Sequence, residues 1–469
     1  MKLERLTATT VIPALGVVLA LIPGCSSPPT PEEAGTIAEE AYIFAYPMLE
    51  NYKTMYAQAV DKSSPAYRAT FNEIYHMSNL LDADFTEVVT PNNDTFYDFI
   101  WLDLRSEPQV LSVPEIPPDR YYAFQLIDMF THNFGYVGSR ATGSQAGNYL
   151  IAGPDWLGET PDGINGVFQS EGQFVLALGR TQVNGEDDAP AVREIQAKYT
   201  VTPLSNFLGQ EEPSSAPVLD FPPYDEKRAG SADFIGYLNF LLGQLKPDTS
   251  EKEMLARFEK IGIQAGVDFD AEDLDPAIRQ AIDQGVASAL TKIKGNIPTL
   301  GEIKNGWMMN MGIFGNRNEM KGKYLTRASA AMIGLYGNTH YEAFYPVCQV
   351  DDKGEPLDGS KHRYVLHFTK DNIPAVRGFW STTIYRLPEK LFVPNPINRY
   401  SIGDRTAGLR YGRDGSLRIY LQKEPPGGST RANWLPAPDG PFYLVCRLYW
   451  PKDMVVLEEC TPPTVRRVQ

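Results

Sequence analysis

A turn that leads directly into a strand, at residues 88–104, is the feature that most constrains this fold. Pro91 fixes its own φ angle, and three short polar side chains follow it that can bond nearby backbone amides. They are Asn92, Asn93 and Asp94. From residue 97 to residue 104 both alternating faces are largely apolar. The sequence therefore predicts a polar turn followed by a strand that is covered on both sides.

Asp103 lies within this strand, on the face that also carries three aromatic side chains. A buried carboxylate either pairs with a cation or a hydrogen-bond donor or has a raised pKa. Two interpretations follow. Asp103 is either an acid or base of a functional site, or half of an Asp–Arg pair. Possible partners nearby in the sequence are Arg105, Arg120 and Arg140.

The first 24 residues have a basic start, a short apolar core and small residues before Cys25. This pattern is typical of an export signal and not of a membrane span. The segment ending at Cys25 resembles a bacterial lipobox, although Pro23 replaces the usual small residue. The resemblance implies cleavage before Cys25, lipidation of its thiol and, because Ser26 follows, an outer-membrane location facing the periplasm. An ordinary cleaved signal peptide is the alternative.

Composition limits the classes of partner. The 469 residues carry a formal net charge of −15, with no compensating basic run. An acidic protein repels phosphate backbones and anionic lipids, so we expect no nucleic-acid binding. Membrane contact is expected only through the lipid anchor. The oligomeric state stays open.

Hydrophobic periodicity divides the rest of the chain. Residues 25–33 form a polar, Pro-rich tether, and residues 34–225 a β domain with a leading helix. Pro47 should kink or split that helix. Residues 226–304 have helical periodicity and residues 305–469 return to strands. The predicted fold is mainly β with helical additions: two β-sandwich or jelly-roll-like domains joined through a helical segment.

Motifs for common cofactors and metals are missing from the sequence. It has no Gly-x-Ser-x-Gly elbow, phosphate loop, dinucleotide fingerprint or His-Glu-x-x-His. The acidic run 268–275 lacks the Gly and Glu of an EF-hand. We predict neither a metal nor a cofactor. Cys348, Cys446 and Cys460 allow at most one disulfide, and Cys446 is predicted to be a core thiol.

Several longer motifs resemble two domain families of unknown function. Five are similar to the family called DUF1254: residues 46–48, 90–97, 101–104, 153–158 and 179–181. Five others are similar to its usual partner, DUF1214: residues 327–331, 379–385, 398–403, 414–417 and 433–438. The resemblance implies two β-sandwich-like domains joined through helices in a bacterial envelope lipoprotein. It implies no catalytic residues, since both families are named for unknown function.

Candidate site residues are therefore chosen by chemistry. Aromatic faces beside amides and carboxylates suit sugars, and two carboxylates can hydrolyse a glycosidic bond. The catalytic candidates are Asp94, Asp128 and Tyr400. The substrate-binding candidates are Asn92, Asn93, Trp101, Trp380, Arg399 and Asn433. Alternatively, Trp380 and Trp434 are core and corner residues.

Two functional hypotheses remain, and whether the protein is an enzyme stays open. The first is a lipid-anchored envelope hydrolase of a glycan or small ester. It predicts that four residues meet in one cleft between the β domains: Asp94, Asp128, Tyr400 and Asn433. The second is a non-catalytic envelope lipoprotein that binds a glycan, a small ligand or a protein partner. It predicts an aromatic or flat binding surface.

Overall fold

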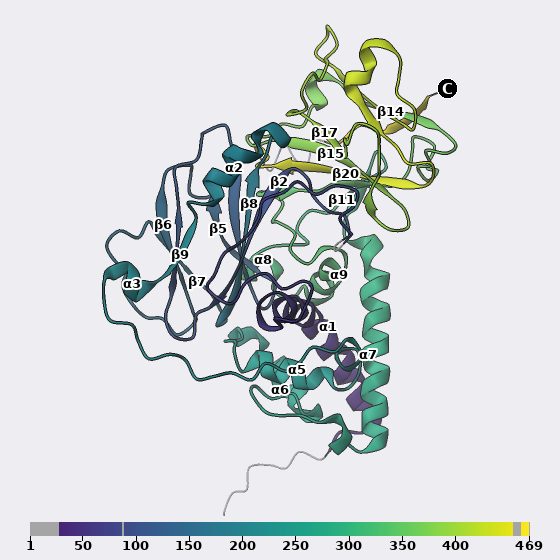
Figure 1. Cartoon of the computed structure of the whole chain (residues 1–469). Coiled ribbons are helices and arrows are strands. Elements are labelled where there is room, and N and C mark those ends of the chain that lie inside the picture. The colour runs from purple at the N-terminus through teal and green to yellow at the C-terminus, as the bar shows by residue number, and fades with distance from the viewer. Residues whose placement is uncertain (1–27, 87–88, 454–460, 469) are drawn as a thin grey trace, which may run out of the picture.

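The computed structural model describes residues 28–86, 89–453 and 461–468. The predicted lipidation site Cys25, its leader and Cys460 lie outside these residues. In Figure 1 the chain forms two β regions, one N-terminal and one C-terminal, with helices packed below their junction. The described strands form four sheets, arranged as two sandwiches. The predicted fold class, mainly β with helical additions, is confirmed.

The N-terminal sandwich pairs a five-stranded with a four-stranded sheet. The first has the order β1 (Tyr75–Met77), β2 (Thr95–Asp103), β8 (Phe174–Gln182), β4 (Tyr122–Asp128) and β5 (Asn133–Gly138). The second has the order β7 (Gly166–Gln169), β6 (Gly147–Ala152), β3 (Gln109–Val113) and β9 (Thr200–Pro203). Apolar side chains from both sheets, including Leu102, Leu111 and Val175, fill the space between them. This layering follows from the two-sided apolar pattern of β2 and β4.

The C-terminal sandwich is also built from two sheets with apolar side chains between them. Its larger sheet has the order β10 (Glu302–Lys304), β11 (Trp307–Met309), β13 (Val347–Cys348), β20 (Phe442–Tyr449), β15 (Trp380–Arg386) and β16 (Leu391–Phe392). There β12 (Ala343–Phe344) also pairs with β20, and β17 (Ser401–Gly403) with β15. The smaller sheet has the order β19 (Trp434–Pro436), β18 (Leu417–Gln422), β14 (Arg363–Phe368) and β21 (Val465–Val468). Cys446 is buried in the core between them, as predicted.

A helical layer covers the outer face of the five-stranded sheet. Its main members are α1 (Pro31–Met55), α5 (Phe234–Leu242), α6 (Lys252–Phe258), α7 (Pro276–Asn296) and α9 (Tyr324–Gly334). Shorter helices are α2 (Ala189–Gln196), α3 (Leu204–Leu208), α4 (Glu226–Ala229) and α8 (Arg317–Met320). The leading helix α1 runs beside α7 (Figure 1), so helices far apart in sequence form one layer.

The start and the middle of α1 differ from expectation. Thr30 caps the helix through a reciprocal bond with Glu33, so residues 31–33 are helical and not part of the tether. Pro47 lies inside α1, but the helix runs unbroken from Pro31 to Met55. Phe44 and Met48, which are buried on either side of Pro47, pack against the helical layer. This packing offsets the stability lost with the backbone hydrogen bond that proline cannot make.

The helical layer owes its close packing to small residues. A Cβ on Gly285 of α7 would collide with the Gly35 carbonyl oxygen and meet the Ala38 Cβ of α1. Glycine therefore lets the two helices approach closely. Among the described residues, no helix combines the length and the apolar composition needed to cross a bilayer.

Candidate functional site

The turn before β2 joins the two sandwiches. The Asp94 side chain is 2% exposed and accepts hydrogen bonds from two groups of the C-terminal domain at 2.6 Å, Ser381 Oγ and Arg405 Nη2. Ser401 Oγ donates to it at 3.4 Å. A guanidinium and two hydroxyls thus compensate the burial of this carboxylate. Asp94 fixes the position of one domain against the other.

Asn92 reinforces the same junction. Its Nδ2 donates at 3.1 Å to Thr95 Oγ1, Tyr97 OH and Tyr449 OH, of which Tyr449 belongs to the C-terminal domain. Its Oδ1 accepts from the Asp94 amide at 2.9 Å. Every polar atom of this buried side chain is therefore occupied within the protein. The structure places Asn92 in the turn, away from the cleft described next.

A cleft of about 790 Å³ lies beside this junction, with walls from both domains. The N-terminal domain contributes residues 80–84, 93–94 and 183–187. The C-terminal domain contributes residues 394–395, 397–401, 403 and 405–407 together with Ser381. Four of the predicted site residues line it: Asn93, Asp94, Arg399 and Tyr400. Nothing in the sequence singled out Ser381, Ser401 or Arg405. Two of them stand in the motifs 379–385 and 398–403, and Arg405 follows directly.

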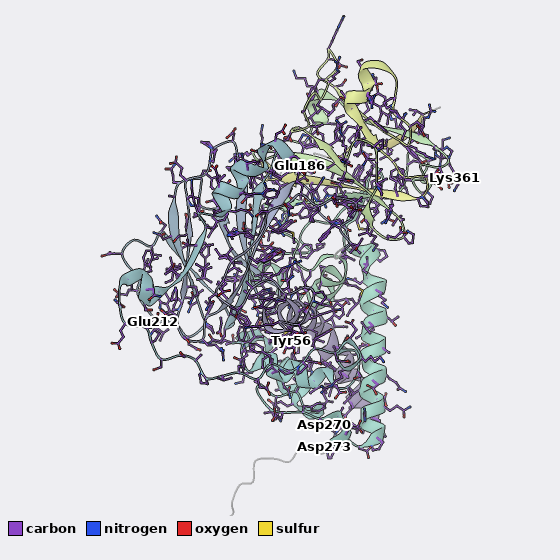
Figure 2. The ribbon with its side chains drawn as sticks, viewed as in Figure 1. Tyr56, Glu186, Glu212, Asp270, Asp273 and Lys361 are labelled. Atoms are coloured by element: carbon purple, nitrogen blue, oxygen red, sulfur yellow. The ribbon has the colours of Figure 1, made fainter. Side chains whose placement is uncertain are left out.

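The charge of the cleft is acidic. Asp82, Asp84, Glu186 and Asp187 are exposed along it, and none makes an ion pair with a described residue. The two arginines that line the cleft, Arg399 and Arg405, already bond groups of the protein. Arg405 pairs with Asp94, and Arg399 Nη1 donates to the carbonyls of Ala432 at 2.9 Å and Trp434 at 2.8 Å. Burial lowers the pKa of Arg399. Figure 2 shows Glu186 at the junction of the two sandwiches.

Three predicted residues lie in cores or loops instead. Trp101 Nε1 donates to Gln58 Oε1 at 3.0 Å beneath the helical layer. Trp380 is buried in the core between the C-terminal sheets, as the alternative predicted. Trp434 is also buried, and its Nε1 donates to the Gln422 carbonyl at 2.7 Å. Asn433 is buried and bonds the Arg410 and Arg418 carbonyls. Asp103 pairs with Arg105 at 2.7 Å, so the Asp–Arg interpretation is confirmed.

Asp128 does not reach the cleft, and the sheet topology explains why. Both β2 and β4 pair antiparallel with β8, so they run in the same direction. Asp94 precedes β2, whereas Asp128 ends β4, and the two residues therefore lie at opposite ends of the sheet. Seven residues of β8 separate Gln182, opposite Thr95, from Val175, opposite Asp128, which corresponds to about 24 Å. The prediction that Asp94, Asp128, Tyr400 and Asn433 share one cleft is wrong.

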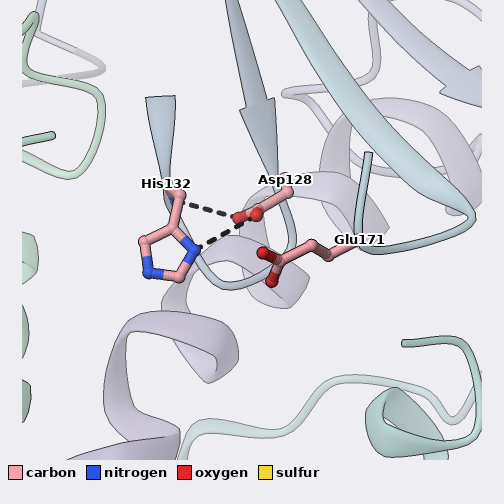
Figure 3. Close-up of side chains that lie close together, drawn as sticks. All are labelled: Asp128, His132 and Glu171. Atoms are coloured by element: carbon pink, nitrogen blue, oxygen red, sulfur yellow. Dashed lines mark hydrogen bonds and ion pairs between the residues drawn. The ribbon is translucent and has the colours of Figure 1, made fainter. Parts of the chain in front are cut away.

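Asp128 belongs to a second cluster, shown in Figure 3. Its Oδ1 accepts from the His132 amide at 2.8 Å, and His132 Nδ1 lies 3.2 Å from its Oδ2. The Glu171 carboxylate points toward both (Figure 3), and one ligand-type atom from each residue lies within 4.8 Å of the others. Spacing in the sequence could not reveal this group, because Glu171 comes from the segment before β8.

The second cluster has the residue types of a metal site, but an arginine already supplies its positive charge. Arg317 Nε donates to both Glu171 oxygens, at 3.1 and 2.8 Å, and its Nη1 donates to Glu251 at 2.6 Å. A metal ion would have to displace this guanidinium. Burial lowers the pKa of His132, whereas Asp128 has a lowered pKa despite its burial because His132 and Arg317 stabilise its anion. The donor set fits a closed ion-pair network better than a metal.

Comparison with known protein families identifies both halves of the chain. The family model described as "Protein of unknown function (DUF1254)" matches residues 71–203, and "Protein of unknown function (DUF1214)" matches residues 342–453. The chain is a DUF1254/DUF1214 domain-containing protein. The DUF1254 region contains the N-terminal sandwich, and the DUF1214 region contains strands β12 to β20 of the C-terminal one. The cleft therefore lies where DUF1254 meets DUF1214.

The DUF1254/DUF1214 protein is similar to solved structures. The crystal structure of the VPA0106 protein from Vibrio parahaemolyticus is 28% identical and matches 93% of this chain and 100% of its own, with a TM-score of 0.75. An uncharacterized protein from Burkholderia cenocepacia is 10% identical over 94% of each chain, with a TM-score of 0.43. No curated protein matches the sequence. The VPA0106 match includes both sandwiches and the helical layer.

Proposed function

We propose that this protein binds a hydroxyl-bearing small molecule of the glycan class in the cleft between its two domains, without turning it over. The observation that carries the proposal is the cleft itself. Its volume of about 790 Å³ falls within the range typical of small-molecule sites, and such sites favour domain interfaces. Asn93 and Tyr400 give it an amide and a phenol group suited to sugar hydroxyls.

The fate of the predicted catalytic residues favours binding over hydrolysis. Glycoside hydrolysis needs two carboxyl groups about 5–9.5 Å apart around the scissile bond. Asp94 is held by Arg405, Ser381 and Ser401, so its lone pairs are committed to the domain junction. Asp128 lies at the other end of the sheet. The cleft therefore lacks the acid and base that the hydrolase hypothesis assigned to it.

The proposal includes a location. A signal segment followed by a lipobox-like sequence supports anchoring of Cys25 in the cell envelope, on the periplasmic side of the outer membrane. Labelling cells with an alkyne fatty acid should mark the wild-type protein and not Cys25→Ser. Equal labelling of both forms would rule out this anchor.

Binding can be tested by calorimetry with neutral trisaccharides, maltotriose and triacetylchitotriose, on the purified protein. Asn93 is half-buried and lines the cleft, so Asn93→Ala removes an amide group from its wall. We expect one of the sugars to bind, and Asn93→Ala to weaken it about fivefold, the value of one hydrogen bond.

Asn372→Ala is the matched control, because Asn372 is exposed and does not line the cleft. It should bind the sugar as the wild type does. Absence of binding by the wild type contradicts the proposed ligand class. Release of shorter sugars during prolonged incubation contradicts the absence of turnover.

A further inference from the structure

We infer that the ligand of the cleft carries a positive charge, as an amino sugar or an amino alcohol with a protonated amine does. This inference rests on the proposed function, because it names the class of ligand for the same site. Its basis is the arrangement of charge around the cleft, which differs on the two walls.

The acidic side chains come from two loops of the N-terminal domain. Asp82 and Asp84 lie in the loop between β1 and β2, and Glu186 and Asp187 follow β8. Leu80 packs in the cluster of Phe96 and Val183, so the segment 80–84 begins beside the residues that follow β8. Four exposed carboxylates thus line a single cavity.

No arginine of the cleft is available for an anionic ligand. The Arg405 guanidinium bonds Asp94 and the Val183 carbonyl and lies 3.7 Å from the centre of the Phe379 ring. Arg399 is held by the carbonyls of Ala432 and Trp434. Because the unpaired charges are all negative and lie in a concave site, the field favours cations and repels anions.

Hydrogen-bonding capacity points in the same direction. The four exposed carboxylates accept hydrogen bonds and do not donate them. An ammonium group has three donors and no acceptor, which complements these carboxylates. The C-terminal domain offers Pro394 and Ile397, on which a sugar ring can pack.

The test compares chitotriose, which has a free amine on each ring, with triacetylchitotriose, its neutral counterpart. Calorimetry is done in mildly acidic, low-salt buffer, where the amines of chitotriose are protonated. We expect the amine form to bind about tenfold more tightly, and the advantage to shrink with added salt because exposed charges are screened.

Two double variants locate the charge. Asp82→Asn with Asp84→Asn, and Glu186→Gln with Asp187→Asn, should each reduce the affinity for chitotriose about threefold and leave triacetylchitotriose unchanged. Asp270→Asn with Asp273→Asn is the matched control, since Figure 2 shows both residues at the far end of the helical layer from Glu186. It should change neither affinity. Thermal unfolding checks that each variant is folded.

The outcomes separate this inference from the proposed function. Equal affinity for the two trisaccharides, or an amine preference that survives both rim variants, overturns the charge inference while sugar binding stands. Tighter binding of trigalacturonate, an anionic sugar, overturns it as well. If no trisaccharide binds, the proposed function fails together with the inference.

Discussion

Asp94 and Asp128 occupy comparable places in the sequence, each beside a strand of the five-stranded sheet, yet they lie in different surroundings. Asp94 is at the wall of the interdomain cleft and is paired with Arg405 of the other domain. Asp128 is sealed between the sheet and the helical layer, where it bonds His132 near Arg317. Both are buried carboxylates, but only the first borders a space that a ligand can enter.

The difference shows that the elements packed against a strand end, and not the sequence of the strand itself, decide whether a carboxylate there borders a cleft. The end of the sheet near Asp94 faces the C-terminal sandwich, and two convex domains leave a cleft between them. The opposite end faces α8 and α9, whose side chains Arg317 and Arg327 fill the space beside Asp128. The following predictions test this contrast.

The largest effect is expected at the junction. Replacing Arg405 by Met leaves the buried Asp94 without its counter-charge, and losing one partner of a buried pair costs about 3–5 kcal/mol. The free energy of unfolding from urea titration should fall by about that amount. Asp439→Asn, which removes the partner of the exposed Lys423, should leave the free energy of unfolding close to that of the wild type. Similar losses in both variants would contradict the claim that the buried Asp94–Arg405 pair stabilises the fold more than an exposed pair does.

A smaller effect is expected in the closed cluster. Arg317→Met removes the cation shared by Glu171 and Glu251. Glu171 is 32% exposed and can be hydrated instead, and the buried Glu251 keeps the hydrogen bond from Tyr324 OH. We expect a loss of about 2–3 kcal/mol in the same titration. A rise in melting temperature of the wild type with zinc or manganese would contradict the assignment of arginine as the resident cation.

The closed cluster should also respond to pH. Burial holds the pKa of His132 below its ordinary value of 6.5, so the unfolded chain takes up this proton more readily than the folded protein. Stability from this residue is complete above pH 6.5 and is lost as the pH falls below that value toward the folded pKa. His132→Gln should flatten the decline of unfolding free energy in that window. An unchanged slope would contradict the burial of a neutral imidazole.

The smallest effect on stability is expected at the cleft rim. Asp82→Asn with Asp84→Asn changes exposed side chains, and asparagine can keep the bond that Asp82 accepts from the Asp84 amide. The free energy of unfolding should stay within about 0.5 kcal/mol of the wild type. A loss of several kcal/mol would mean that these carboxylates maintain the fold, as Asp94 does.

Local patterns in the sequence predicted much of the fold. The strands around residues 97–104 and 442–449 have buried alternating faces that depend only on near neighbours, and Trp380 and Cys446 are core residues as proposed. The partnership of α1 with α7 could not be predicted, because nothing local specifies which apolar stripe covers which. Pro47 likewise sits in a continuous helix because tertiary packing overrides its propensity.

The candidate site was predictable only in part, for the same reason. Asn93, Asp94, Arg399 and Tyr400 carry local signals, since each is a polar residue in a turn or a loop next to a strand. Arg405 and the acidic residues of the cleft can be recognised only from the folded structure, in which two loops of the N-terminal domain meet the C-terminal domain. Asp128, a carboxylate within an apolar strand, was expected to share a cleft with Asp94, but strand direction placed it at the other end of the sheet.

The most direct test is hydrogen–deuterium exchange of the purified protein with and without a saturating chito-trisaccharide. The account predicts slower exchange in the segments that line the cleft, residues 80–84, 183–187 and 394–407, and no change at residues 128–132 or 317–327. Protection confined to the Asp128 cluster, or to neither region, would contradict the claim that the interdomain cleft is the binding site.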